Sequence, residues 1–263
     1  SMLYFQNWEL VAQNADYAAA SQETSPLQHL WSMSVQGQFY VFGILLGWVV
    51  AVAVVKLHAK PEHARRAAIA LLAVITVVSF AWASRFGLEG TGENYYSTFS
   101  RAWELSLGAL LAFVPANRFL PQATAWLTAL LGVVLIAVTG LIVPTSLAFP
   151  GPVALIPLTG AALVILSGNA NGVSRVLASA PMTWLGSVAY SLYLWHWPLL
   201  IIVTVIGGYD TPPAWLGALV IVVSLCLAHV THTLVEDPLR QHRPRPRGDD
   251  HPVAAARASL RTL

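Results

Sequence analysis

The stretch from Leu185 to Ile202 constrains the fold of this chain most strongly. It contains no Asp, Glu, Lys or Arg, and a histidine, His196, lies near its middle. An uncharged apolar stretch of about 20 residues is typical of a membrane span. A titratable side chain inside a span costs free energy and usually faces protein or a cavity instead of lipid. We therefore expect a membrane protein in which His196 marks an interior site.

The remainder of the chain is also strongly apolar, with 56% hydrophobic and 10% charged residues, whereas a soluble domain is about 25% charged. Continuous apolar runs, in place of alternating ones, predict helices and argue against a β-barrel. The fold class is therefore all-α, a polytopic transmembrane helix bundle. Two of the seven expected spans, the third and the fifth, are short for a bilayer. The expected spans are 32–55, 65–84, 99–114, 124–143, 152–167, 183–206 and 214–235.

The Lys and Arg residues segregate if these seven spans alternate across the membrane. All of them except Arg85 and Arg101 fall on one side. Cytoplasmic loops are enriched in Lys and Arg, so this side is predicted to be cytoplasmic, with residue 1 outside and the C-terminus inside. We divide the chain into a membrane domain, 1–238, and a basic, proline-rich cytoplasmic tail, 239–263. The tail is expected to rest on anionic lipid headgroups, and binding to nucleic acid is not expected.

Polar side chains enter the first span from its outer end. His29, Trp31 and Gln38 lie there, and in a helix His29, Ser32 and Gln36 would share one face. Two interpretations fit these residues equally well. One is a capped helix start with aromatic side chains at the membrane interface, and the other is a binding site.

Arg101 and Glu104 open the third span. Three residues apart in a helix, they share a face and are expected to form an ion pair. Membrane topology does not explain Arg101, because only one other basic residue lies outside. We therefore favour a function in which Arg101 binds an anionic or polar group of a substrate. Glu104 would position either Arg101 or a catalytic histidine.

The surroundings of His196 also favour an interior site. Pro198 removes a backbone donor and is expected to strain the helix, and such breaks often line a cavity. The walls of that cavity would be aromatic: Tyr190, Tyr193, Trp195 and Trp197.

His229, His232 and Glu236 recur at spacings of three and four at the end of the last span. On one helical face they could resemble a metal site. We favour a structural latch at the helix end and predict no metal, because no cysteine or further carboxylate joins them. Glu236 and Arg240, four apart, are expected to pair, and Pro238 is expected to end the helix.

Four stretches taken together resemble the acyltransferase-3 family of membrane O-acyltransferases. They are Asn7-Trp8 with 25–40, Arg101–Gly108, Leu185–Pro198 and Val235–Arg240. The resemblance implies ten spans, of which this chain would supply the last seven. The family's presumed catalytic His and Arg, and a basic motif linked to acyl-CoA, would lie in the three preceding spans. Where many relatives read Val-Glu-Glu-Gln-Phe-Tyr, this chain reads Val35-Gln-Gly-Gln-Phe-Tyr40, which removes the charge at Gln36.

The resemblance implies transfer of an acyl group, most simply acetyl, from acyl-CoA to a hydroxyl of a cell-envelope glycan or glycolipid. The protein would lie in the bacterial inner membrane, and a histidine would deprotonate the hydroxyl or carry the acyl group. His196, Glu104 and Arg101 are the candidate catalytic residues. His29, Trp31, Gln38, Tyr193 and Trp195 are the candidate substrate-binding residues, and Glu236, Arg240 and Pro198 are structural.

Two alternatives remain. The chain could be a catalytically inactive scaffold or a partner of other membrane subunits, which Gln36-Gly37 and the missing spans favour. It could also be a small-solute transporter with a buried histidine and broken helices. The seven spans contain no evident internal repeat, which makes the transporter less favoured.

Overall fold

The computed structural model describes residues 3–13, 25–56, 60–114, 122–144, 149–168, 171–209 and 212–241. Every element within these ranges is helical, which confirms the predicted all-α polytopic bundle. Among the described residues, five helical segments are long and apolar enough to cross a membrane. They are Gln28–Lys56, Glu62–Phe86, Thr124–Ile142, Ala180–Gly207 and Ala214–Arg240.

Each of the seven predicted spans corresponds to a helix. The helices are α2 (Trp31–Lys56), α3 (Pro61–Ala83), α5 (Thr98–Leu111), α6 (Gln122–Ile142), α7 (Leu155–Leu166), α9 (Ala180–Gly207) and α10 (Ala214–Thr231). The two that were expected to be short, α5 and α7, have 14 and 12 residues. At about 1.5 Å per residue, they are shorter than the roughly 30 Å apolar core of a bilayer.

Short helical elements connect and cover these helices. They are α1 (Gln6–Ala12), η1 (Gln28–Leu30), η2 (Ser84–Phe86), α4 (Gly92–Tyr96), η4 (Pro152–Ala154), α8 (Gly172–Leu177), η5 (His232–Glu236) and α11 (Asp237–Gln241). α1 packs against α4 and α2. The N-terminal segment is therefore held beside the beginning of α2, where the candidate binding residues lie.

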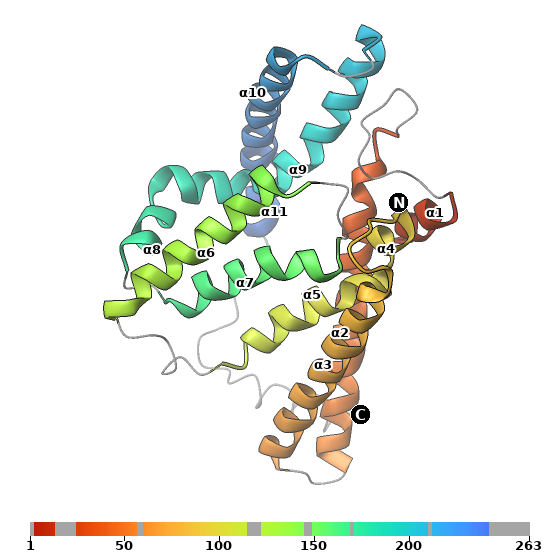
Figure 1. The fold of residues 1–263 in the computed structure, drawn as a ribbon, viewed down its shortest axis with the longest axis vertical. Coiled ribbons are helices and arrows are strands. Elements are labelled where there is room, and N and C mark those ends of the chain that lie inside the picture. The colour runs from red at the N-terminus through yellow and green to blue at the C-terminus, as the bar shows by residue number, and fades with distance from the viewer. Residues whose placement is uncertain are drawn as a thin grey trace.

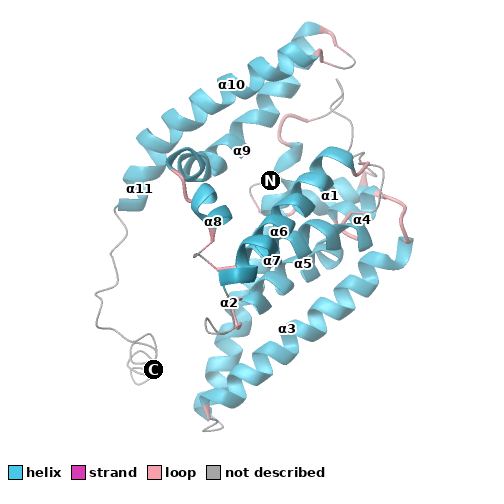
Figure 2. Cartoon of the chain, turned by 60° about the vertical axis from the view of Figure 1, so that its left-hand side comes forward, coloured by secondary structure: helices cyan, strands magenta, loops and turns pink. Residues whose placement is uncertain are grey.

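The long helices pack mainly in pairs, and the most extensive contacts join α3 to α5, α6 to α7 and α9 to α10. Figure 1 shows α9 and α10 at the upper end of the molecule and α2 and α3 at the lower end, with α5, α6 and α7 between them. Figure 2 shows the same order from another side.

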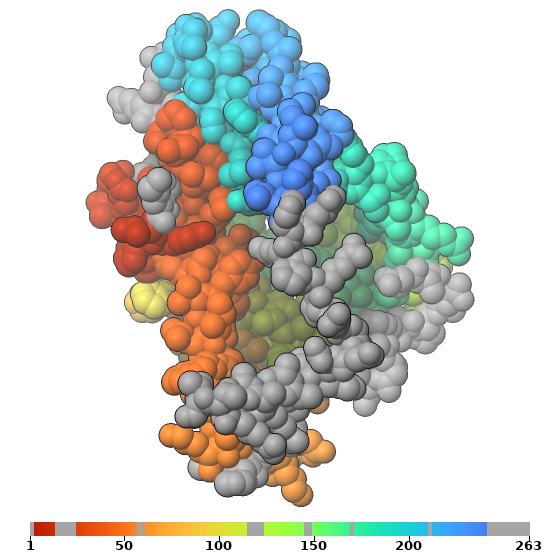
Figure 3. Space-filling model, turned by 180° about the vertical axis from the view of Figure 1, so that it is seen from behind, coloured from red at the N-terminus to blue at the C-terminus, as the bar shows by residue number. Residues whose placement is uncertain are grey.

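Glycines distinguish a tight helix crossing from an open helix face. A Cβ atom added at Gly132 of α6 would lie 2.5 Å from the Gly160 carbonyl oxygen of α7, and one at Gly160 would lie 2.6 Å from the Gly132 oxygen. Small residues of this kind let helix backbones approach closely in membranes. A Cβ atom added at Gly43 or Gly47 of α2, in contrast, would meet no neighbouring atom of the described residues within 4 Å. Figure 3 shows α2 extended along the molecular surface.

Pro198, which was expected to strain its helix, lies inside α9, and the expectation that Pro238 ends the last helix was wrong. α9 continues through Pro198, because a proline removes one donor and neighbouring groups can satisfy the freed carbonyl in a membrane helix. The last helix continues through the π-helical turn η5 into α11, which contains Pro238. Pro238 falls in the first turn of α11, where its missing N–H is tolerated.

Candidate functional site

α9 carries polar and aromatic side chains on two opposite faces, which follows from its rotation of about 100° per residue. On one face, Trp195 donates its indole N–H to the Thr231 hydroxyl of α10, at 3.0 Å. On the other, Tyr193 and His196 contact His29, from the segment that precedes α2. The structure therefore brings Tyr193 to His196 and His29 and places Trp195 elsewhere.

His29, Tyr193, His196 and Trp197 form one group, the histidine cluster. The ring centroid of His29 lies 4.9 Å from that of Tyr193, 5.9 Å from that of His196 and 6.4 Å from that of Trp197. The Tyr193 and His196 rings are 5.9 Å apart. The cluster thus joins residues from η1 and from the middle of α9, which no local spacing in the sequence could have brought together.

The imidazole of His29 is buried, with 8% of the residue exposed. The Pro26 carbonyl approaches it, but neither ring nitrogen has a hydrogen-bond partner of regular geometry among the described residues. A buried polar atom without a partner costs about 1–3 kcal/mol, and native structures contain few of them. His29 can therefore offer both a donor and an acceptor to a bound polar group.

The main chain of His29 is held by α9. The Tyr193 hydroxyl donates a hydrogen bond to the His29 carbonyl. Because that uses the single proton of Tyr193, the Ser32 hydroxyl, 2.8 Å from Tyr193 Oη, must be the donor to it. Trp197 adds a bond from its indole N–H to the Ser25 carbonyl, at 3.3 Å. These bonds fix the segment before α2 against α9.

Among the described residues, one of the two ring nitrogens of His196 is hydrogen-bonded to the protein. Its Nδ1 lies 3.1 Å from the Leu192 carbonyl oxygen. A carbonyl can only accept, so Nδ1 carries the proton in this bond. In the neutral imidazole, Nε2 then holds a lone pair. His196 can therefore act as a proton acceptor at Nε2.

Trp31, Tyr95, Arg101 and Glu104 form a second group, the arginine cluster. The predicted pair between Arg101 and Glu104 is confirmed at 3.2 Å, and 14% and 20% of these two side chains are exposed. Arg101 also donates to the Tyr95 carbonyl at 3.0 Å, and its guanidinium carbon lies 5.1 Å from the Trp31 ring centroid. Among the described residues, the hydrogen bonds of Glu104 go to Arg101 and not to a histidine. Since Trp31 directly follows η1, the two clusters adjoin.

Gln38 lies in a separate polar network. It donates to the Asn7 side-chain oxygen at 3.0 Å, and its own oxygen accepts from the Thr98 hydroxyl at 2.6 Å and from the Trp8 indole at 3.3 Å. Asn7 is fully buried. The network joins α1 to α2 and α5. Sequence reasoning missed the contributions of Asn7 and Thr98, although Asn7-Trp8 belongs to the stretches that carried the resemblance.

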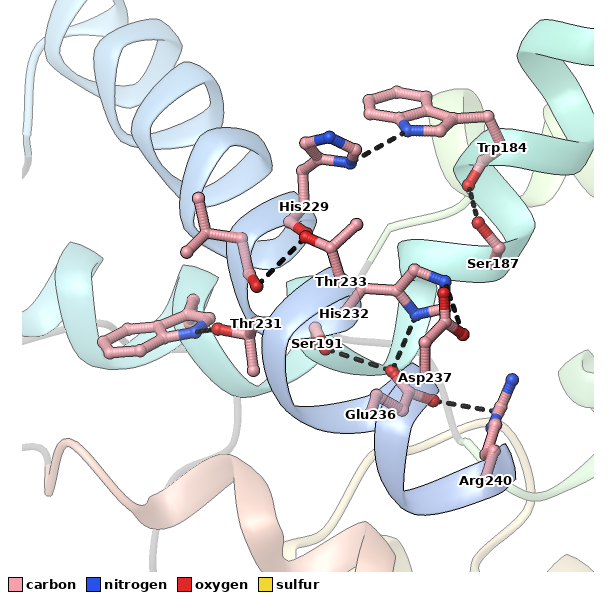
Figure 4. Close-up of polar contacts among 12 residues, drawn as sticks. Trp184, Ser187, Ser191, His229, Thr231, His232, Thr233, Glu236, Asp237 and Arg240 are labelled. Carbon is pink, nitrogen blue, oxygen red and sulfur yellow. Dashed lines mark hydrogen bonds and ion pairs between the residues drawn. The ribbon is translucent and has the colours of Figure 1, made fainter. Parts of the chain in front are cut away.

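The end of the last span forms a third group, the latch, shown in Figure 4. The predicted pair between Glu236 and Arg240 is confirmed at 2.8 Å. Glu236 also accepts from the Ser191 hydroxyl of α9 at 3.2 Å and lies 3.1 Å from His232 Nδ1. These contacts tie α9 to η5 and α11.

Two details of the latch differ from expectation. Asp237 is a further carboxylate in the group, 3.4 Å from His232 Nε2. His229 turns away and contacts Trp184 of α9 at 3.4 Å. Within the described ranges, no set of three or more His, Cys, Asp or Glu residues could hold a metal ion.

Comparison with known proteins finds a family model described as an acyltransferase domain, which matches residues 2–231. The peptidoglycan O-acetyltransferase OatA of Listeria monocytogenes is 26% identical over 92% of this chain and 40% of its own length. The putative peptidoglycan O-acetyltransferase YrhL of Bacillus subtilis is 28% identical over 91% of the chain and 39% of its own length. The putative membrane-bound transacylase BcsY of Komagataeibacter xylinus is 28% identical over 80% of the chain and 50% of its own length. The chain thus spans half or less of these relatives. No solved structure matches it significantly.

Proposed function

The chain belongs to the acyltransferase-3 family, and from this premise we propose that it transfers an acyl group from acyl-CoA to a hydroxyl of a cell-envelope glycan or glycolipid. Acetyl is the simplest acyl group, and the names of the OatA and YrhL relatives support both acetyl transfer and a peptidoglycan acceptor.

The observation that carries the proposal is the histidine cluster. It combines a lone pair on His196 Nε2 with the buried ring of His29, whose nitrogens have no partner of regular geometry among the described residues. The centroids of the two rings lie 5.9 Å apart. A general base within hydrogen-bond reach of a hydroxyl can remove its proton as the hydroxyl oxygen attacks the thioester carbonyl. His196 is proposed to shape and polarise the site in which such a base acts.

The arginine cluster supports a role in binding the acceptor. Arg101 is held between Trp31 and Tyr95, and Glu104 balances its charge. A guanidinium fixed in this way is suited to an anionic or polar group of a glycan. Arg101 would therefore orient the acceptor, with Glu104 as its positioning partner.

The predicted orientation places the two substrates on opposite sides of the site. With the C-terminus in the cytoplasm, α9 enters from that side, and His196 lies about 24 Å along a helix rising 1.5 Å per residue. Acyl-CoA would approach from the cytoplasm, and the glycan from the outer face of the bacterial inner membrane. We retain the division into a membrane domain, 1–238, and a tail, 239–263. Residues 242–263 lie outside the described residues.

The inactive scaffold is the second candidate, favoured by the uncharged Gln36-Gly37. Gln36 is exposed on α2, and the contacts that define the histidine cluster do not include it. The loss of charge at Gln36 therefore leaves that cluster intact, which supports the enzyme over the scaffold.

The test is transfer of labelled acetyl from acetyl-CoA to soluble peptidoglycan fragments by the full-length protein in bacterial membranes. We expect transfer by the wild type and a fall of about 100-fold in His196→Ala, as for loss of a group that stabilises charge in the transition state. His229→Ala, which changes an exposed histidine on α10, is the control. Wild-type turnover in His196→Ala would exclude His196 from the site. Absence of transfer by the wild type would favour the scaffold.

A further inference from the structure

An apolar pocket lies beside α2, separate from the residues proposed to act in the reaction. We propose that this pocket binds the hydrocarbon chain of the acceptor, and that the acceptor is therefore a glycolipid whose polar end lies at the arginine cluster. This inference rests on the proposed function and deepens it, because it chooses the glycolipid over the free glycan as the substrate class.

The pocket lies between α2 and the segment that precedes α1. Residues 3–5 line one side, and Gly37, Gln38, Tyr40 and Val41 line the other, around a volume of about 510 Å³. Ligand pockets typically have volumes of about 300–1,000 Å³. Apart from Gln38, the side chains in the lining are apolar or aromatic. The size and the lining of the pocket therefore suit an apolar group.

The amide of Gln38 is already engaged within the protein. Its nitrogen donates to the Tyr4 carbonyl at 2.6 Å and to the Asn7 side-chain oxygen at 3.0 Å. Its oxygen accepts from the Thr98 hydroxyl at 2.6 Å and from the Trp8 indole at 3.3 Å. Because a side-chain amide has two N–H donors and two lone pairs on its oxygen, these four bonds use its full capacity. A group in the pocket would therefore pack against Gln38 without a hydrogen bond to it.

Tyr4 forms the wall of the pocket that lies against α2. Its φ is 57°, a left-handed conformation that residues other than glycine adopt uncommonly, and the bond from Gln38 to its carbonyl holds it there. The Tyr4 ring packs on the backbone of α2 at Gly37, where an added Cβ atom would lie 2.7 Å from Tyr4 Cε1. Gly37 thus makes room for the ring, and the two residues together shape the pocket.

The order of polar and apolar groups along α2 matches that of a lipid in the outer leaflet. The Arg101 guanidinium lies 5.1 Å from the ring of Trp31, the first residue of α2. Gln38 lies two turns further along the helix, about 10 Å at 1.5 Å per residue. In the predicted orientation α2 enters the membrane from outside, so the pocket is deeper than the arginine cluster. A guanidinium binds phosphate and other anionic groups, so one glycolipid can place its polar end at Arg101 and its chain in the pocket.

Acetyl transfer by the full-length protein in phosphatidylglycerol nanodiscs tests the inference. One acceptor is a peptidoglycan disaccharide joined through pyrophosphate to a long polyprenyl chain, and the other is the same disaccharide pyrophosphate without the chain. Val41→Trp fills the pocket and should raise the KM for the chain-bearing acceptor about 10-fold, with no change for the chainless one. Val49→Trp is the matched control and should change neither KM, because Val49 is a similarly exposed valine of α2 outside the pocket lining, 54% against 59%.

A pair of glycine variants tests the wall of the pocket without a bulky side chain. Gly37→Ala forces the Tyr4 ring to move, whereas the alanine in Gly43→Ala would meet no neighbouring atom of the described residues within 4 Å. Alanine favours a helix more than glycine does, so a folding defect is not expected in either variant. We expect Gly37→Ala to raise the KM for the chain-bearing acceptor, by less than Val41→Trp does, and Gly43→Ala to leave it unchanged.

Cross-linking locates the chain independently of transfer. A diazirine on the polyprenyl chain should label residues 3–5 or 37–41, and excess unlabelled acceptor should prevent the labelling while added phosphatidylglycerol should not. Labelling that phosphatidylglycerol prevents equally well would assign the pocket to bulk lipid and overturn the inference. An unchanged KM for the chain-bearing acceptor in Val41→Trp would also overturn it, while transfer to the chainless acceptor would still uphold the enzyme. If the wild type transfers to neither acceptor, the proposed function fails, and specific labelling of the pocket supports the glycolipid site by itself.

Discussion

The two faces of α9 differ in whether the buried polar groups beside them are hydrogen-bonded. Towards α10 and α11, Ser191 bonds to Glu236, which also pairs with His232 and Arg240. Towards η1, the His29 ring has no hydrogen-bond partner of regular geometry among the described residues, and one nitrogen of His196 is hydrogen-bonded. Satisfied polar groups hold helices together, whereas an unsatisfied one calls for a specific explanation, such as a catalytic role. The comparison supports a structural role for the latch and the proposed role of the histidine cluster in the reaction.

The largest expected effect concerns whether His29 and His196 act as a unit. If both contact one hydroxyl, the double variant His29→Ala, His196→Ala should lose little more transfer than the worse single variant. Residues that act together are strongly non-additive, and the single loss in His196→Ala is expected to be about 100-fold. Initial rates of acetyl transfer for the wild type, both single variants and the double variant measure this. Losses that multiply would show two independent roles.

An intermediate effect is expected in the latch. Glu236→Ala leaves His232, Ser191 and Arg240 without their common partner and should lower the free energy of unfolding by about 1–3 kcal/mol. The thermal midpoint of the purified protein in detergent measures the loss. Transfer per folded molecule should remain near that of the wild type. Glu236 contacts the face of α9 that is opposite to the histidine cluster. Arg240→Ala is the control: its side chain is 62% exposed, so its removal should cost less than about 1 kcal/mol. A loss of turnover at full stability would place the latch in the reaction.

The smallest effect is expected at Trp195, which the sequence suggested as a substrate-binding residue. Its indole bonds to Thr231 on the α10 side. Trp195→Phe should cost about 1 kcal/mol or less, the usual net value of one hydrogen bond, and should leave the KM for the glycan fragment unchanged. Trp197→Phe, on the histidine side, is the comparison. A raised KM in Trp195→Phe alone would indicate that the glycan binds on the α10 side of α9.

Local features of the site were predictable because helix geometry determines them. Residues three or four apart share a face, so the pairs between Arg101 and Glu104 and between Glu236 and Arg240 could be expected from spacing alone. α9 continues through Pro198, since a proline in a packed membrane helix removes one donor without ending the helix. Gln38 illustrates a different limit, because its partners Asn7 and Thr98 come from distant parts of the chain.

The sequence by itself determined that this is a helical membrane protein and showed which side chains share each helix face. Length, apolar composition and the 3.6-residue period are local properties of the chain. Only the tertiary structure decided which faces meet: it placed His29 beside His196, turned Trp195 towards α10 and enclosed Gln38 in a network with Asn7. The physical reason is that helix periodicity specifies an orientation about one axis, whereas contacts between helices depend on packing across the whole bundle.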